Sequence, residues 1–145
     1  MRDNEFKVLV HSCKKYKKYS DGQTIQKNYS PDFSLKCGNK FIIIEHETEP
    51  NRKTIIADIF KAAYFLQEEK EGVLVIVMTP KGASSFESYP KHVLPYYKWL
   101  KDKTNLLDVI FVHESHYYCN YVVLVINEPD FIKNSTSLNS MINTQ

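Results

Sequence analysis

Apolar residues near the start of the chain are spaced three and four positions apart, as on one face of a helix. This spacing predicts an amphipathic helix over residues 3–19, with the short run Val8–Val10 leaving a strand as the alternative. The polar residues 20–30 then predict a loop. The apolar positions that carry the helix are Phe6, Leu9, Val10, Cys13 and Tyr16.

A two-residue turn at Gly38 and Asn39 separates two segments with strand character. Gly and Asn at the centre of such a turn are a strong signal for a β-hairpin. The segments 32–36 and 41–44 therefore predict two paired strands, and the second strand runs on to Glu47.

The rest of the chain alternates between helical and strand patterns. An apolar stripe predicts a helix over 54–69, and the uniformly apolar run Val73–Met78 predicts a central strand covered on both faces. The other expected elements are a helix at 91–103, strands at 108–112 and 121–126, and a polar, flexible tail at 134–145. This order predicts an α/β fold with a single mixed β-sheet flanked by helices.

The composition fits one globular domain, which we expect over residues 1–133. The 145 residues are 43% hydrophobic and 25% charged, which suffices for a buried core. No apolar run approaches the roughly 18 residues of a membrane helix, and no apolar signal segment follows the charged N-terminus. Three widely spaced cysteines are typical of a reducing compartment. We expect a cytoplasmic protein without a membrane partner or, lacking a phosphate-binding glycine motif, a nucleotide cofactor.

Acidic residues gather on one face of the predicted hairpin. Cross-strand partners share a face, so Asp32 faces Glu45, and Glu47 points the same way because it lies two residues further on. Lys36 lies further along that face. Three neighbouring carboxylates repel one another and need compensation, and Mg²⁺ or Mn²⁺ is the cation that hard oxygen ligands favour. The hairpin therefore predicts a divalent metal site at Asp32, Glu45 and Glu47.

Less specific roles for these residues stay open. Asp32 could be a turn residue after Pro31, and both glutamates could lie at a solvated strand end. His46 has the opposite parity to the acids, which indicates a buried structural histidine rather than a metal ligand.

The hairpin and its surroundings resemble the core of the PD-(D/E)xK restriction-endonuclease-like superfamily over about residues 3–80. The resemblance implies a core of a helix, three strands, a helix and a strand, with Asp32 and Glu45 as metal ligands. Glu47 stands where the superfamily usually has lysine, so a displaced charge would come from Lys36, Lys53 or Lys61. The acid-rich strand, followed by Lys61 and Tyr64, is also similar to the replication-relaxation proteins of mobile plasmids.

Positive charge is concentrated in the first part of the chain. Residues 1–53 contain 11 Lys and Arg against 7 Asp and Glu, whereas residues 54–145 contain 8 against 10. Basic residues near Tyr16 and Tyr19 suit a phosphate backbone and stacked bases, although a solvated helix face would show the same cluster. The expected nucleic-acid-binding residues are Lys14, Lys15, Lys17, Lys18 and Arg52.

These features predict a nuclease that depends on Mg²⁺ or Mn²⁺ and hydrolyses DNA. Asp32 and Glu45 would bind the metal, and Glu47 would hold a metal-bound water or a second metal. Lys36 or Lys53 would stabilise charge on the phosphate. Because many enzymes of the superfamily pair two active sites to cut two strands, a homodimer is expected as well. Two alternatives stay open: an inactive module of the same fold that binds nucleic acid or partner proteins, and an unrelated α/β interaction protein with surface carboxylates.

Overall fold

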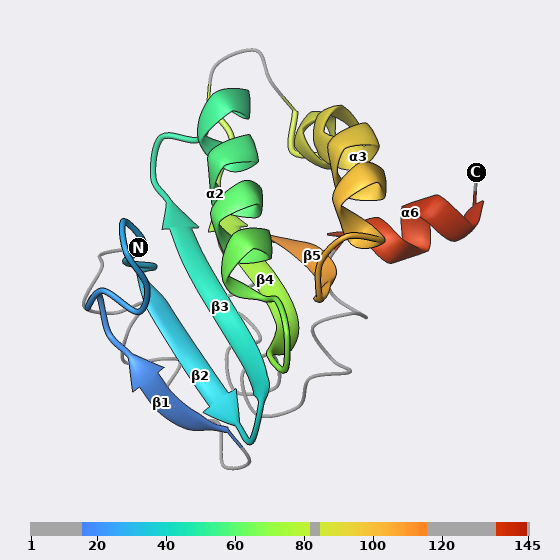
Figure 1. Cartoon of the computed structure of the whole chain (residues 1–145). Coiled ribbons are helices and arrows are strands. Elements are labelled where there is room, and N and C mark those ends of the chain that lie inside the picture. The colour runs from blue at the N-terminus through green and yellow to red at the C-terminus, as the bar shows by residue number, and fades with distance from the viewer. Residues whose placement is uncertain (1–15, 82–84, 116–135, 145) are drawn as a thin grey trace.

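The computed structural model describes residues 16–81, 85–115 and 136–144. These residues form one six-stranded sheet, in the order β1-β2-β3-β4-β5-β6, with helices packed against it (Figure 1). The strands are β1 (Lys17–Ser20), β2 (Phe33–Cys37), β3 (Lys40–Glu47), β4 (Glu71–Met78), β5 (Leu106–His113) and β6 (Thr136–Ser137). The helices are α2 (Arg52–Phe65), α3 (Ser88–Lys101) and α6 (Leu138–Thr144).

The connections between strands decide their relative directions. Strands β1, β2 and β3 are antiparallel neighbours, as short connections allow. Helix α2 connects β3 to β4 and helix α3 connects β4 to β5, and both of these strand pairs are parallel, as crossovers through a helix require. The last strand, β6, runs antiparallel to β5. The predicted class, α/β with a single mixed sheet, is confirmed for the described residues.

The β2–β3 hairpin has the register that the sequence predicts. Cys37 lies opposite Lys40, and Gly38 adopts a φ of 63°, a conformation that glycine takes without strain. The pairing continues to the other end of the hairpin, where Asp32 comes directly before β2 and next to Glu45 of β3. The hairpin therefore carries the predicted acids to the end of the sheet away from the turn.

Helix α2 begins one turn earlier in the chain than its apolar stripe, because Asn51 caps it. The Asn51 side chain accepts a hydrogen bond of 2.9 Å from the backbone N–H of Thr54. Ile55 and Ile59 are buried toward the sheet. The helix ends at Phe65, four residues before the predicted end.

Both faces of the central strands are buried. On the face covered by α2 and α3, Ile43 of β3, Ile76 of β4 and Phe111 of β5 belong to one apolar cluster. On the opposite face, Ile44 and Val75 belong to a second cluster. This confirms that β4 is a central strand. Among the described residues, no helix has the length and apolar character needed to cross a bilayer.

The start of the described chain differs from the prediction. The segment Lys17–Ser20, expected as the end of a helix, forms the edge strand β1 and pairs with β2. Its first three residues are exposed, so the strand has little apolar signal. Residues 3–15 of that helix, and the strand expected at 121–126, lie outside the described residues.

The end of the chain also differs from the expected flexible tail. Residues 136–144 form β6 and α6, and the side chain of Leu138 is fully buried. The Ser137 hydroxyl donates a hydrogen bond to the carboxylate of Asp108, and the backbone N–H of Asn139 donates another of 3.1 Å. These bonds fix the segment against β5.

Candidate metal centre

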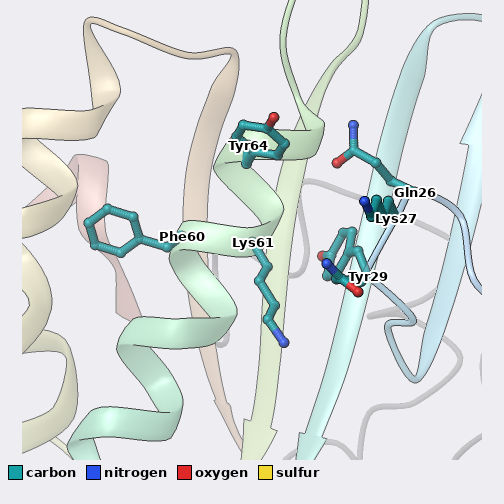
Figure 2. Close-up of a pocket in the computed structure, with 7 residues that line it drawn as sticks. Gln26, Lys27, Tyr29, Phe60, Lys61 and Tyr64 are labelled. Carbon is teal, nitrogen blue, oxygen red and sulfur yellow. The ribbon is translucent and has the colours of Figure 1, made fainter.

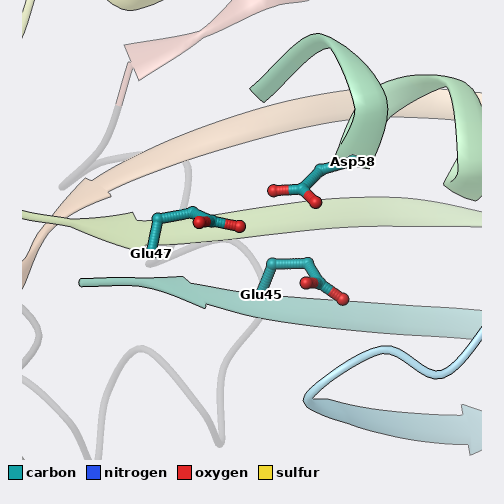
Figure 3. Close-up of side chains that lie close together, drawn as sticks. All are labelled: Glu45, Glu47 and Asp58. Carbon is teal, nitrogen blue, oxygen red and sulfur yellow. The ribbon is translucent and has the colours of Figure 1, made fainter. Parts of the chain in front are cut away.

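Three carboxylates from β3 and α2 form a tight group. Glu45 and Glu47 project from the same face of β3, and Asp58 projects toward them from α2 (Figure 3). Among the described residues, these three offer carboxylate oxygens that all lie within 4.8 Å of one another. All three side chains are partly buried. We call Glu45, Glu47 and Asp58 the acid cluster.

Asp32 lies beside the acid cluster and holds its first member. The backbone N–H of Asp32 donates a hydrogen bond of 3.2 Å to Glu45 Oε1. Asp32 Oδ2 in turn accepts a hydrogen bond of 2.7 Å from the backbone N–H of His46. The structure therefore brings the three predicted acids together, with Asp32 positioned on the β2 side of Glu45.

Asp58 is the member of the acid cluster that the sequence analysis did not single out. It lies three positions after Ile55 and four before Ala62, both of which are buried. At helical spacing, this places an acid within the apolar stripe that faces the sheet. An acid within a buried stripe is the sequence feature that could have indicated Asp58 as a candidate.

Burial and the repulsion of neighbouring carboxylates raise the pKa values of two members of the acid cluster, Glu45 and Asp58. Burial, followed by the charge of Asp32 and then of Glu47, raises the pKa of Glu45 to about 8, although the positive charge of Lys61 opposes the rise. The pKa of Asp58 is raised by burial first, and then by a hydrogen bond with Glu47 and the charge of Glu45. At neutral pH these carboxyls therefore take up protons unless a cation neutralises them.

The donor set of the cluster fits a hard divalent cation. Mg²⁺ and Mn²⁺ prefer carboxylate oxygens and usually bind one or two of them together with water. Asp58 Oδ2 is buried and has no hydrogen-bond partner among the described residues, so this oxygen has a lone pair to offer. Glu45, Glu47 and Asp58 could hold such an ion, with Asp32 fixing the orientation of Glu45.

The three candidate lysines lie in different places. Lys61, on α2, interacts electrostatically with Glu45. Lys36 instead packs on aromatic rings, 5.3 Å from the centre of the Tyr19 ring and 5.4 Å from that of Phe41. Its register position is four residues from that of Asp32, or about 13 Å along the strand. Lys36, predicted as catalytic, is therefore not brought to the acid cluster.

Lys53 lies in the first turn of α2. With Arg52, Lys81 and Tyr89 it lines a hollow of about 620 Å³. Arg52 and Lys53 are exposed, and the partial positive charge of a helix N-terminus adds to theirs. The positive charge of this hollow suits a phosphate group, and a catalytic role of Lys53 stays a prediction.

The predicted nucleic-acid contacts are partly placed. Lys17 and Lys18 are exposed on the edge strand β1, and Lys17 lies opposite Lys36 of β2. The three lysines thus give the edge of the sheet a positive charge. The remaining two predicted contacts on this segment, Lys14 and Lys15, lie outside the described residues.

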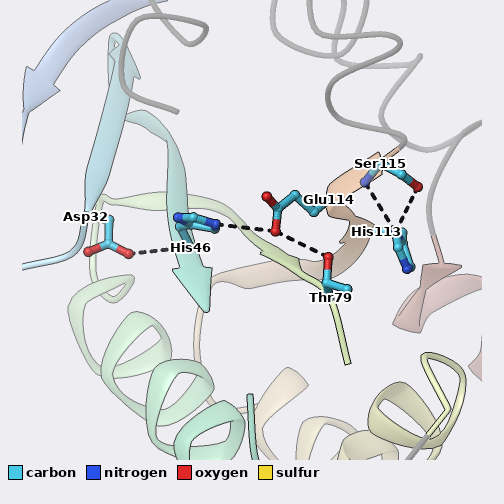
Figure 4. Close-up of polar contacts among 6 residues, drawn as sticks. All are labelled: Asp32, His46, Thr79, His113, Glu114 and Ser115. Carbon is cyan, nitrogen blue, oxygen red and sulfur yellow. Dashed lines mark hydrogen bonds and ion pairs between the residues drawn. The ribbon is translucent and has the colours of Figure 1, made fainter. Parts of the chain in front are cut away.

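A second polar group lies on the other face of the sheet (Figure 4). His46 Nε2 lies 3.8 Å from Glu114 Oε2, and Glu114 accepts a hydrogen bond of 3.2 Å from the Thr79 hydroxyl. His46 is buried, as predicted for a structural histidine. Since its backbone N–H also holds Asp32, this group supports the acid cluster from behind. His113 Nδ1 forms a hydrogen bond of 2.9 Å with the Ser115 hydroxyl.

Comparison of the chain with protein-family models, with curated proteins and with solved structures gives no match.

Proposed function

We propose that this protein is a nuclease that uses Mg²⁺ or Mn²⁺, bound at the acid cluster, to hydrolyse phosphodiester bonds in DNA. The observation that carries the proposal is the convergence of Glu45, Glu47 and Asp58 within 4.8 Å, in a partly buried place with Lys61 beside it. Gathering three carboxylates in a partly buried place costs free energy through desolvation and repulsion, and a bound cation would offset that cost.

The order of elements supports the same proposal. Strands β1, β2 and β3, followed by α2 and β4, give three strands, a helix and a strand. This is the order that the restriction-endonuclease-like core would have after its first helix. Glu45, on β3, is one of the two metal ligands that the resemblance implies, whereas Asp58, on α2, is an addition to that pattern.

Each residue has a role in the proposed hydrolysis. A bound Mg²⁺ would polarise the phosphate and lower the pKa of its water. Glu47 accepts a proton from the attacking water, whose oxygen forms a bond to phosphorus. The bond from phosphorus to the leaving sugar oxygen breaks, and that oxygen takes up a proton from solvent. Lys61 stabilises the negative charge that builds on the phosphate, which is the role of the lysine that Glu47 replaces.

Basic residues from separate elements would hold the DNA backbone. Arg52 and Lys53 begin α2 and line one hollow with Lys81, which follows β4, and Lys17 and Lys18 lie on β1. Such contacts position a nucleic acid without reading its sequence. If the enzyme cuts both strands of a duplex, it would do so as a homodimer with two acid clusters.

Cleavage of supercoiled plasmid and of branched DNA tests the proposal. Wild-type protein should cut in the presence of Mg²⁺ or Mn²⁺ and not with EDTA. Asp32→Ala, Glu45→Ala and Asp58→Asn should each reduce cleavage by roughly 100-fold or more. Glu69→Gln, which changes an exposed acid outside the cluster, is the matched control.

The same assay separates the alternative function. DNA binding that weakens as salt rises, with no cleavage under any divalent cation, would indicate an inactive nuclease-fold module. Full cleavage by Asp58→Asn would show that the cluster is not the active site.

A further inference from the structure

A pocket of about 380 Å³ lies between the turn at residues 26–29 and helix α2 (Figure 2). One wall is the turn that contains Lys27 and Tyr29, and the other is α2 with Phe60, Lys61 and Tyr64. Lys61 connects the pocket with the acid cluster, because it lines the pocket and also interacts electrostatically with Glu45. The size lies at the lower end of the range for small-ligand pockets, which suits one nucleotide-sized group.

The turn holds Tyr29 rigidly at the floor of this pocket. Its backbone N–H donates a hydrogen bond of 2.9 Å to the carbonyl of Gln26, and Asn28 adopts a left-handed φ of 64°. Asparagine tolerates this conformation better than most residues. The Tyr29 ring packs 6.0 Å from the ring of Phe65 on α2. The side chain is therefore fixed between the turn and the helix.

The Tyr29 hydroxyl is a buried polar group close to the acid cluster. The residue is 5% exposed, and its hydroxyl has no hydrogen-bond partner among the described residues. A buried polar group without a partner costs free energy, so a structural role alone does not account for this tyrosine. Burial is the main cause of the raised pKa of Tyr29, and the charges of Glu45 and Asp58 add to it. Tyr29 therefore lies near the acid cluster, and the same residue lines the pocket.

The other pocket residues offer the chemistry of nucleotide recognition. Tyr64 is 68% exposed, so the pocket carries an aromatic side chain on which a base could stack, whereas the Phe60 ring projects from α2 away from Tyr29 (Figure 2). Lys27 and Lys61 are exposed cations placed for phosphate. Hydrogen-bonding amides line the same pocket, from Gln26 and Asn28.

We propose that this pocket binds an unpaired nucleobase next to the scissile phosphate, so that the substrate is single-stranded DNA or an unpaired part of branched DNA. A base inside a duplex is stacked on both faces and cannot enter a pocket without being extruded. The inference rests on the proposed function, since it assigns the substrate of the same site.

Fluorescence anisotropy in EDTA tests the proposal without any cleavage. The probes are a short labelled oligothymidylate, the same backbone with abasic residues, and a duplex containing the thymidylate strand. Wild-type protein should bind the oligothymidylate more tightly than the abasic strand and the duplex. Tyr64→Ala should weaken binding of the oligothymidylate by roughly 5- to 150-fold, the range for loss of one stacked base. The Tyr64→Ala variant should also bind the oligothymidylate and the abasic strand with nearly equal affinity.

Tyr96→Ala is the matched control, because Tyr96 is an exposed tyrosine of α3 that does not line the pocket. It should keep the wild-type preference for bases. Equal binding of the abasic and normal strands by wild-type protein, or an unchanged preference in Tyr64→Ala, would overturn the proposal.

The two proposals fail in different ways. Cleavage without a preference for bases would leave the nuclease in place and remove the pocket assignment. A preference for bases that Tyr64→Ala abolishes, without cleavage under any divalent cation, would leave the pocket in place and remove the nuclease.

Discussion

Glu45→Gln makes the electrostatics of the acid cluster measurable. The substitution keeps the size of the side chain and an oxygen that can accept the hydrogen bond from the Asp32 backbone N–H. It removes the ability to ionise. Because burial and repulsion raise the pKa of Glu45 from 4.5 to about 8, the wild-type carboxyl stays protonated in the folded protein at pH 7 but ionises on unfolding.

The direction of the pH dependence follows from this difference. A carboxyl whose pKa is higher in the folded state contributes full stability below its unfolded pKa, and loses it as pH rises toward its folded pKa. Each pH unit within this window lowers the free energy of unfolding by about 1.4 kcal/mol. For Glu45 alone, raising the pH from 5 to 7 therefore lowers it by about 3 kcal/mol.

Urea unfolding at pH 5, 6, 7 and 8 in EDTA measures this loss. Glu45→Gln should be close to wild type at pH 5 and more stable by about 2 to 3 kcal/mol at pH 7. Mn²⁺ at about 100 times its dissociation constant should restore about 2.7 kcal/mol to wild type, and much less to the variant. Glu69→Gln should follow wild type throughout. Wild-type stability that stays level or rises between pH 5 and 7, with Glu45→Gln indistinguishable from Glu69→Gln, would refute the reasoning.

Three further variants test the site and the fold. Lys61→Ala should lower kcat for DNA cleavage by roughly 10- to 100-fold while Mn²⁺ still binds, whereas Lys36→Ala should leave kcat near wild type; equal kcat values for both variants in a steady-state assay would contradict the placement of Lys61. Gly72→Ala should destabilise by roughly 3 kcal/mol or more in urea unfolding, because the added carbon would lie 2.2 Å from the carbonyl oxygen of Phe41; a loss under 1 kcal/mol would contradict this packing. Leu138→Ala should lower the free energy of unfolding by about 2 to 5 kcal/mol, because the Leu138 side chain is fully buried. An unchanged urea midpoint would contradict the packing of α6 and favour the predicted flexible tail.

The hairpin and the face on which its acids lie could be predicted from the sequence, because the signals for both are local. A glycine-centred turn fixes the register, and the alternation of a strand then fixes which side chains share a face. The gathering of Asp32, Glu45 and Glu47 follows from those two rules alone. Lys36 shares the face of these acids, because it lies an even number of residues from Asp32. Alternation does not give the distance along the strand, and at its position Lys36 packs on Tyr19 and Phe41 rather than on the acids.

The approach of Asp58 to Glu45 depends on how α2 crosses the sheet, so an acid within an apolar stripe indicates an anomaly but not its partner. Lys61 was one of three candidate lysines, and the packing of α2 is what brings it into electrostatic interaction with Glu45. The C-terminal segment was missed for a similar reason. It is polar in sequence, and what orders it is a set of hydrogen bonds to Asp108, some thirty residues away along the chain.

Strand β1 was mistaken for a helix because edge strands carry weak signals. Its lysines face solvent, and edge strands often carry such charges to discourage pairing with other chains. Consecutive basic residues therefore resemble the exposed face of a helix.

The most direct test of the acid cluster is a Mn²⁺ titration followed by electron paramagnetic resonance of the free ion. Wild-type protein should take up Mn²⁺ more tightly as pH rises from 6 to 8, because the cation displaces protons from carboxyls with raised pKa values. Asp58→Asn should bind at least about 10-fold more weakly, and Glu69→Gln should bind like wild type. Equal Mn²⁺ binding by all three proteins, with no dependence on pH, would contradict the account.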